Sequence, residues 1–279
     1  MSIINKMNEF LDFFNYAFFY RALIMSVLAG LSCGIIGVWF ILLNIPFIGV
    51  AIAHCAFAGA VMGLFLGINP ILSGFVLCVI ASVIIDPISQ KAKVHNNISI
   101  NLLFSLSIGI AFIFAGLLKE RLHDIFAFFW GNLLISSQTD ILLNFIICIL
   151  LVLFAIFFHK AVIALFFSRE ISKACGIPEN FIFLLLILLS CATISLNLKS
   201  IGGLLIYSLI SLPAASAYQL TNNIKSMYFL SSLFAVASCI CGLIISTFVH
   251  LPAGATIVLV SCMAFIISLI FSKKKNYKK

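Results

Sequence analysis

The sequence predicts an all-α protein, a polytopic transmembrane helical bundle of about eight to nine spans. Three observations lead to this fold class: 64% of the 279 residues are hydrophobic, 9% are charged, and long apolar windows separate the charges. Soluble domains carry roughly 25% charged residues, so a water-soluble fold is excluded. Membrane-spanning barrel strands alternate polar and apolar residues, whereas these windows are continuously apolar, so the spans are expected to be helices.

The charge-free windows set the positions of the spans. No Lys, Arg, Asp or Glu lies between Arg21 and Asp86, and at about 20 residues per helix this interval holds three spans. Turn residues divide it at 44–46 and again at 67–70. Further windows follow at 94–118, 141–159, 180–198, 200–224 and 226–272, the last long enough for two helices. The total is about nine spans, and a version with about eight, in which the first segment lies flat on the membrane, stays open.

The two ends of the chain differ from the apolar body between them. Residues 1–16 mix charged and aromatic side chains, which is typical of an amphipathic lead-in at the membrane interface. Residues 17–272 form the predicted transmembrane domain, and residues 273–279 form a basic tail. If the tail is cytoplasmic, counting back through nine spans places eleven Lys and Arg inside and five outside, a bias that predicts an external amino terminus. The net charge of +8 then reflects membrane topology, and no nucleic-acid partner is expected.

The second predicted span carries small residues at every fourth position. These are Ala51, Cys55, Gly59, Gly63 and Gly67. Such a stripe allows another helix to approach closely, and a helix of the same subunit is favoured over a dimer seam. Residues 119–139 form the longest external connection and are expected to lie at the outer surface as an apolar hairpin or re-entrant piece.

Common enzyme motifs do not occur in the sequence, which contains no GxSxG, HExxH or GxxxxGK[ST] stretch. Any work driven by ATP would therefore need another chain to hydrolyse it. The nine Cys lie in or beside apolar runs without a CxxC pair, so neither disulfides nor a permanently bound metal cofactor is expected.

A few polar or irregular residues within the spans mark a candidate transport path. His54 lies inside the second span, where an ionisable group usually faces the bundle interior; a structural hydrogen bond and transient binding of a metal ion both stay open as its role. Pro213 removes an amide donor and is predicted to break its helix, which a membrane tolerates where protein or a wet cavity supplies partners. His250 lies at the outer mouth between the last two spans. No carboxylate is clearly placed at mid-membrane, which argues against a proton-coupled carrier.

A short charged segment near 166–178 interrupts the apolar sequence. Arg169, Glu170 and Lys173 lie in a stretch of helical character, Gly176 suits the position after a helix end, and Pro178 blocks continuation. The pattern predicts a short amphipathic helix at the inner surface. A soluble ATPase that pressed on this helix could rock the bundle.

Six passages, taken together, carry a resemblance to a known family. They are VAIAHCAFAG at 50–59, NISINLLFSLSIG at 97–109, FFWGNLL at 128–134, SREISKACGI at 168–177, SIGGLLIYSLISLPAASA at 200–217 and HLPAGATIVL at 250–259. Their order and spacing resemble the ABC-3 family, the permease subunits of bacterial ABC importers for zinc, manganese and iron. Six positions depart from the family pattern. Ala58 replaces a usual Pro, Asn101 a Gly and Ser172 an Ala, and Asn97, Ser168 and His250 stand where an Asp is usual.

The resemblance implies a homodimeric or pseudo-dimeric translocation pore in the bacterial inner membrane. A periplasmic binding protein would deliver the metal, and two copies of a cytoplasmic ATPase would dock around Glu170. His54 would line the route and touch the metal transiently, and Gly254 would shape the outer mouth. The departures at Asn97 and His250 favour zinc, which accepts imidazole, over manganese, which prefers oxygen, with manganese or iron as alternatives. A stand-alone secondary transporter would need inverted repeats and a buried coupling carboxylate, and neither is found.

Overall fold

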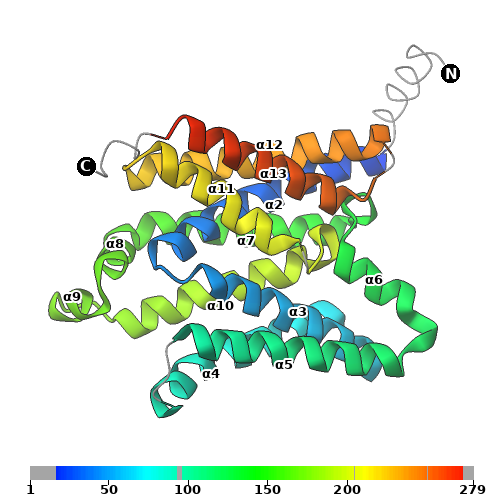
Figure 1. Ribbon diagram of the computed structural model, residues 1–279, viewed down its shortest axis with the longest axis horizontal. Coiled ribbons are helices and arrows are strands. Elements are labelled where there is room, and N and C mark those ends of the chain that lie inside the picture. The colour runs from blue at the N-terminus through cyan, green and yellow to red at the C-terminus, as the bar shows by residue number, and fades with distance from the viewer. Residues whose placement is uncertain (1–16, 93–95, 204, 250, 273–279) are drawn as a thin grey trace.

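Helices make up all the regular structure in the described part of the chain. The computed structural model describes residues 17–92, 96–203, 205–249 and 251–272. Most of these helices run along one common direction and lie side by side (Figure 1). The all-α prediction is confirmed for these ranges, whereas the predicted lead-in over 1–16, the basic tail over 273–279 and His250 lie outside them.

The longer helices each coincide with one window expected from the sequence. They are α2 (Ala17–Leu42), α3 (Pro46–Leu66), α4 (Pro70–Ala92), α5 (Asn96–Leu117), α7 (Gln138–Phe157), α10 (Glu179–Ile201), α11 (Ile206–Leu220), α12 (Ile224–Val249) and α13 (Ala253–Ile270). Shorter pieces connect them: η1 (Lys119–Arg121), α6 (Leu122–Trp130), η2 (Leu133–Ile135), α8 (His159–Phe167) and α9 (Arg169–Ala174).

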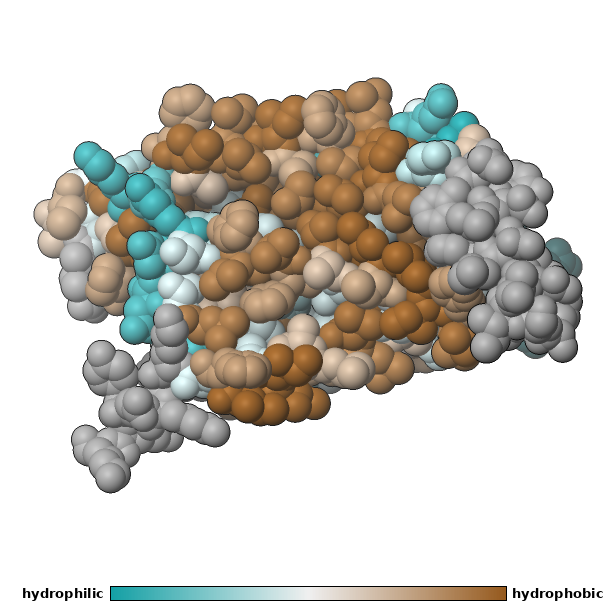
Figure 2. All heavy atoms as spheres, turned by 90° about the horizontal axis from the view of Figure 1, so that it is seen from above, coloured by the Kyte–Doolittle hydropathy of each residue, from teal (hydrophilic) through white to brown (hydrophobic). Residues whose placement is uncertain are grey.

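Among the described residues, 7 helices are long and apolar enough to cross a membrane, judged by length and composition. The described apolar part of α4, Pro70–Ile84, is shorter, and α11 has only 15 residues. The expected total of about eight to nine spans therefore stays a prediction. Figure 2 shows a broad hydrophobic surface over the middle of the molecule with hydrophilic residues toward its ends, as expected of a bundle surrounded by lipid.

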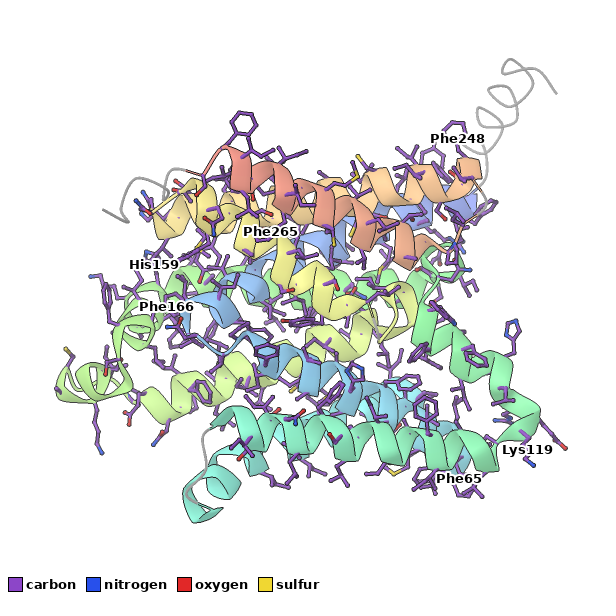
Figure 3. The ribbon with its side chains drawn as sticks, viewed as in Figure 1. Phe65, Lys119, His159, Phe166, Phe248 and Phe265 are labelled. Atoms are coloured by element: carbon purple, nitrogen blue, oxygen red, sulfur yellow. The ribbon has the colours of Figure 1, made fainter. Side chains whose placement is uncertain are left out.

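The two ends of the bundle carry different groups of connections. Phe65, Lys119 and Phe248 lie at one end, and His159 and Phe166 lie at the other (Figure 3). The α2–α3 turn, the α11–α12 turn and the pair α8 and α9 all lie toward the end that carries His159 (Figure 1). These connections, near residues 44–49, 220–227 and 160–180, are ones that counting back through nine spans places on one side of the membrane, and the structure brings them to one end of the bundle (Figure 1).

Helix α3 lies in the interior, as its small residues indicate. Ala51, Cys55, Gly59 and Gly63 are buried, and the hydroxyl of Ser73 in α4 donates a hydrogen bond of 2.7 Å to the Gly59 carbonyl. A Cβ at Gly59 would lie 2.6 Å from the Ser73 carbonyl oxygen, so the stripe serves close packing of α3 against α4 within one chain. The fifth small residue, Gly67, instead ends α3 in the left-handed conformation, with φ of 72°.

Helix α11 corrects one expectation. It continues through Pro213 from Ile206 to Leu220, so the predicted break at this proline is wrong. A proline removes only one backbone hydrogen bond, and the helix packs closely against Gly37 of α2 on either side of Pro213, through Ile210 and Ala214. The irregular backbone lies earlier, where Gly202 adopts a φ of 98° between α10 and α11.

The connection 119–139, expected as an apolar hairpin or re-entrant piece at the outer surface, contains η1, α6 and η2 and ends in the first residues of α7. Phe126 and Trp130 of α6 are 53% and 45% exposed, whereas Ile125 and Leu133 are buried. Helix α6 slants across the end of the bundle between α5 and α7 (Figure 1). Its exposed aromatic side chains suit the membrane–water interface.

Candidate functional site

His54 lies in the first half of α3 and is buried, with 8% of its surface exposed. Its Nδ1 lies 2.9 Å from the Val50 carbonyl oxygen, and because a carbonyl can only accept, Nδ1 carries the proton. The ring meets Phe104 of α5 edge to face at 4.7 Å between centroids. In the neutral ring this arrangement leaves Nε2 with a lone pair, the form in which imidazole binds a metal ion.

A pocket of about 390 Å³ lies beside His54. Its walls are Phe47, Val50, Ile100, Asn101 and Phe104, and two of these residues, Val50 and Phe104, contact the imidazole directly. Asn101 supplies the polar side chain in this pocket. The pocket therefore combines an apolar wall with one amide next to a buried imidazole.

A second pocket, of about 530 Å³, adjoins the first through Phe47. It is lined by Ile41, Asn44, Pro46, Phe47, Tyr207, Ser211, Leu212, Ala215, Tyr218 and Gln219. Several of these side chains carry oxygen or nitrogen atoms, and none is a carboxylate. Phe47 is the residue common to both linings, and we call the two pockets together, along α3, α5 and α11, the Phe47 tract.

The predicted path residues stand in different relations to the Phe47 tract. His54 does not itself line the first pocket, but it contacts two of the lining residues, Val50 and Phe104. Pro213 is buried and does not line the second pocket, but its neighbours Ser211, Leu212 and Ala215 do. The structure thus brings the surroundings of His54 and Pro213 together around one exposed phenylalanine.

Gly254 lies apart from the Phe47 tract, in a tight junction at the start of α13. A Cβ at this position would lie 2.7 Å from the carbonyl oxygens of both Ile201 and Trp130. The backbones at Gly131 and Gly202 approach each other in the same junction. Gly254 therefore permits close packing of three chain segments, and its role at an outer mouth stays a prediction.

The described residues contain no group of three or more His, Cys, Asp or Glu side chains placed to hold a metal ion. His54 would thus need further ligands from water or from a second molecule. An open site of this kind suits transient contact with a passing ion, because permeation requires weak binding.

The predicted inner-surface helix is present as α9, which together with α8 extends beyond the long helices at one end (Figure 1). Gly176 follows it with a φ of 73°, as predicted for a residue after a helix end. Lys173, Cys175 and Gly176 are exposed, and Phe167 is 77% exposed. The side chains of Arg169 and Glu170 are outside the described residues.

Sequence reasoning missed two features of these sites. Tyr207 and Asn101 were not singled out as lining residues, because only the packing of α3 against α5 and α11 reveals which faces border the pockets. The ion pair between Asp140 and Lys199 was also missed, although both charges lie close to the ends of predicted spans. The position of a charge near a helix end gave a signal, but its partner lies 59 residues away.

Comparisons with known proteins agree on one family. The profile of the ABC 3 transport family matches residues 15–272. The "Manganese transport system membrane protein MntC" of Halalkalibacterium halodurans is 30% identical over 263 residues, 94% of this chain and 90% of the relative. The "High-affinity zinc uptake system membrane protein ZnuB" of Haemophilus influenzae is 26% identical over 250 residues, 90% of this chain and 96% of the relative.

A solved structure extends this similarity to the fold. A chain in the structure titled "PsaBC from Streptococcus pneumoniae in complex with Fab" superposes with a TM-score of 0.88 at 29% identity, covering 97% of this chain and 98% of the other. The arrangement of helices described above is therefore similar to that chain along nearly its whole length.

Proposed function

The chain belongs to the ABC 3 transport family, and from this membership we propose that it imports zinc as the translocation subunit of a complex driven by a separate ATPase. As a metal ABC transporter permease it is a bacterial membrane protein that moves metal ions. The choice of zinc rests on the donor atoms at the Phe47 tract. Imidazole suits zinc, whereas manganese prefers carboxylate, carbonyl and water oxygens.

One observation supports the choice of zinc: His54 lies behind the wall of the first pocket, with its Nδ1 donating to the carbonyl of the lining residue Val50. The two pockets, in the described part of the chain, have no carboxylate in their walls. A cation in transit would meet an imidazole lone pair, hydroxyl groups and amide oxygens. This donor set favours a borderline metal ion.

Manganese is the second candidate, because relatives near 30% identity are manganese transport proteins by name. The zinc relative is 26% identical. Amide and hydroxyl oxygens such as those of Asn101 and Ser211 can contact manganese as readily as zinc. Sequence identity separates the manganese relatives from the zinc relative only weakly, so the transported metal must be measured.

The Phe47 tract supports a route formed between two copies of the chain. Phe47 is 59% exposed on the surface of one chain, and His54 alone supplies too few ligands to accompany an ion across a membrane. A second copy facing this tract would double the imidazoles and enclose both pockets. We therefore assign His54 and the α11 segment around Pro213 to the wall of a homodimeric route.

The ends of the bundle offer separate places for the other components. Helices α8 and α9 extend at the end that carries His159 and Phe166 (Figure 3), and there we place the cytoplasmic ATPase, with Arg169, Glu170, Lys173 and Gly176 at the contact. In the same assignment the carboxyl terminus is cytoplasmic. The opposite end, with α6 and the Gly254 junction, would receive a periplasmic metal-binding protein across the inner membrane.

The test of cargo is uptake by liposomes that contain the chain together with its ATPase and binding protein. We expect ATP-dependent uptake of radiolabelled zinc that excess unlabelled zinc suppresses more strongly than excess unlabelled manganese. His54→Ala should lower the uptake, whereas Ile149→Ala, at an exposed position on α7, should leave it unchanged. Preferential uptake of manganese would show that manganese, not zinc, is the transported metal. Equal zinc uptake by both variants would remove His54 from the route.

A further inference from the structure

A groove of about 550 Å³ lies between α2, α7 and α12, away from the Phe47 tract. It is lined by Leu31, Ile35, Val152, Ala155, Ile156, His159, Lys225, Tyr228, Phe229 and Ser232. Most of these side chains are apolar, and the two that carry or can gain positive charge are His159 and Lys225. The metal route described above uses none of these residues.

The spacing of the lining residues gives the groove its direction. Positions 152, 155, 156 and 159 form one face along α7 and the start of α8, and positions 225, 228, 229 and 232 form one face of α12. Seven residues of helix rise by about 10 Å. The groove is therefore an elongated slot, with α2 as its floor and α7 and α12 as its walls.

Both basic side chains lie at the same end of this slot. His159 begins α8, directly after α7 ends, and Lys225 is the second residue of α12. Figure 3 shows His159 at the end of the molecule opposite Lys119 and Phe248. The slot is thus polar at the membrane boundary and apolar toward the membrane interior.

The positive charge at the mouth lacks a protein counter-ion in the described part of the chain. The ion pair in the described residues joins Lys199 to Asp140, away from the mouth of the slot. Lys225 is exposed, and its backbone amide is occupied by a hydrogen bond to Asn223. The Lys225 ammonium is consequently free to bind an external anion.

We propose that this slot binds an anionic glycerophospholipid, with its phosphate on Lys225 and His159 and one acyl chain along α7 and α12. Ammonium and imidazole N–H groups donate strong hydrogen bonds to phosphate oxygens. Basic pockets between transmembrane helices are suited to anionic headgroups. The apolar walls formed by Val152, Ile156 and Phe229 match a hydrocarbon chain and would not retain a free phosphate ion.

A second groove, also lined by α2 and α7, allows a comparison with the slot within the same protein. It has a volume of about 590 Å³ and lies between α2 and α7, with Ile24, Val27, Leu28, Gln138, Ile141, Leu142 and Phe145 as its lining. This lining contains no cation. Hydrocarbon can fill either groove, but only the slot with Lys225 and His159 distinguishes an anionic headgroup from a neutral one.

The proposal is tested by native mass spectrometry of the full chain, purified in mild detergent and supplied with dioleoyl phosphatidylglycerol or dioleoyl phosphatidylcholine. We expect retention of phosphatidylglycerol in preference to phosphatidylcholine. One lysine at a membrane surface changes anionic lipid binding about fivefold, so Lys225→Glu should lower retention by about fivefold or more. Lys160→Glu is the matched control, because Lys160 is exposed at the same end and does not line the slot.

Two further arms separate the acyl chain from the headgroup. Ala155→Phe fills the slot without changing charge and should also lower phosphatidylglycerol retention, and Lys225→Gln replaces Lys225→Glu if the charge reversal prevents folding. Millimolar glycerol 3-phosphate should not displace the lipid. Equal retention of both lipids, unchanged retention in the Lys225 variant, or displacement by glycerol 3-phosphate would each overturn the proposal.

Discussion

The ammonium of Lys199 lies 3.1 Å from a carboxylate oxygen of Asp140, joining the last turn of α10 to the first turn of α7. The Asp140 side chain is 11% exposed and that of Lys199 is 33% exposed. Asp140 also accepts a hydrogen bond from the Ser137 amide, while the Ser137 hydroxyl accepts one from the Asp140 amide. One carboxylate therefore both caps a helix and ties it to a second helix.

Removal of this carboxylate should destabilise the protein more than removal of its partner. Asp140→Ala loses the hydrogen bond to the Ser137 amide and the ion pair, which corresponds to about 1–3 kcal/mol, whereas Lys199→Met loses a partly exposed pair worth up to about 1 kcal/mol. Thermal unfolding in detergent measures both effects. Lys119→Met, at an exposed position on η1, is the control, and equal midpoints for Asp140→Ala and this control would contradict the assignment.

A second long-range contact holds α2 to α12. The indole N–H of Trp39, a fully buried residue, donates a hydrogen bond of 2.8 Å to the Tyr228 hydroxyl. Tyr228→Phe would leave that N–H without its partner, at a cost of about 1–3 kcal/mol. We expect a lower unfolding midpoint than for Tyr20→Phe, since Tyr20 is 55% exposed; no difference between the two variants would show that the bond is dispensable.

The junction at Gly254 should reject even a methyl group. A Cβ there would approach the carbonyl oxygens of Ile201 and Trp130 too closely, so Gly254→Ala must displace the backbone of a neighbouring segment. Gly109, inside α5, has open space around a new Cβ, and Gly109→Ala should stabilise its helix by about 0.5–1 kcal/mol. Folded yield and unfolding midpoint should therefore both fall in Gly254→Ala, whereas the unfolding midpoint should rise in Gly109→Ala. An unchanged yield and midpoint in Gly254→Ala would contradict the close packing at this junction.

The positions of the helices could be predicted because the lipid environment determines them, whereas the contacts between helices could not, because they depend on tertiary packing. Charge-free windows locate the long helices because every backbone amide in hydrocarbon must be hydrogen-bonded. Gly59 and Gly63 predict a close helix contact, but only the tertiary structure identifies α4 as the partner. Pro213 shows the limit of local rules, because the expected break is absent from a helix whose neighbours support it.

The candidate site divides in the same way. His54 is conspicuous in an apolar sequence, since an ionisable side chain in a membrane helix requires a reason. The lining residue Tyr207 carries no local signal, because its place beside Phe47 depends on how α11 crosses the bundle. The slot with Lys225 could not be predicted from the sequence either, because α8, α9, α10 and α11 lie between His159 and Lys225 in the chain.

Helix α9, which we assign to the inner surface, should transmit work from the ATPase. Glu170→Arg reverses one charge at the proposed contact and is expected to abolish metal-dependent stimulation of ATP hydrolysis while leaving membrane insertion intact. Glu120→Arg makes the same reversal on η1, where Glu120 is exposed at the other end of the bundle, and should leave the association of the ATPase with the chain unchanged. Normal stimulation in Glu170→Arg, or equal loss of ATPase association in both variants, would exclude a specific coupling role for Glu170.

The most direct test of the account is whether transport requires a separate ATPase. Liposomes containing the chain with its ATPase, the metal-binding protein and ATP should accumulate zinc. Accumulation should stop when the ATPase or ATP is omitted, and His54→Ala should lower the rate about tenfold if its contact contributes about 1.4 kcal/mol to the barrier. Accumulation by the chain alone, driven by an ion gradient, would contradict the central claim.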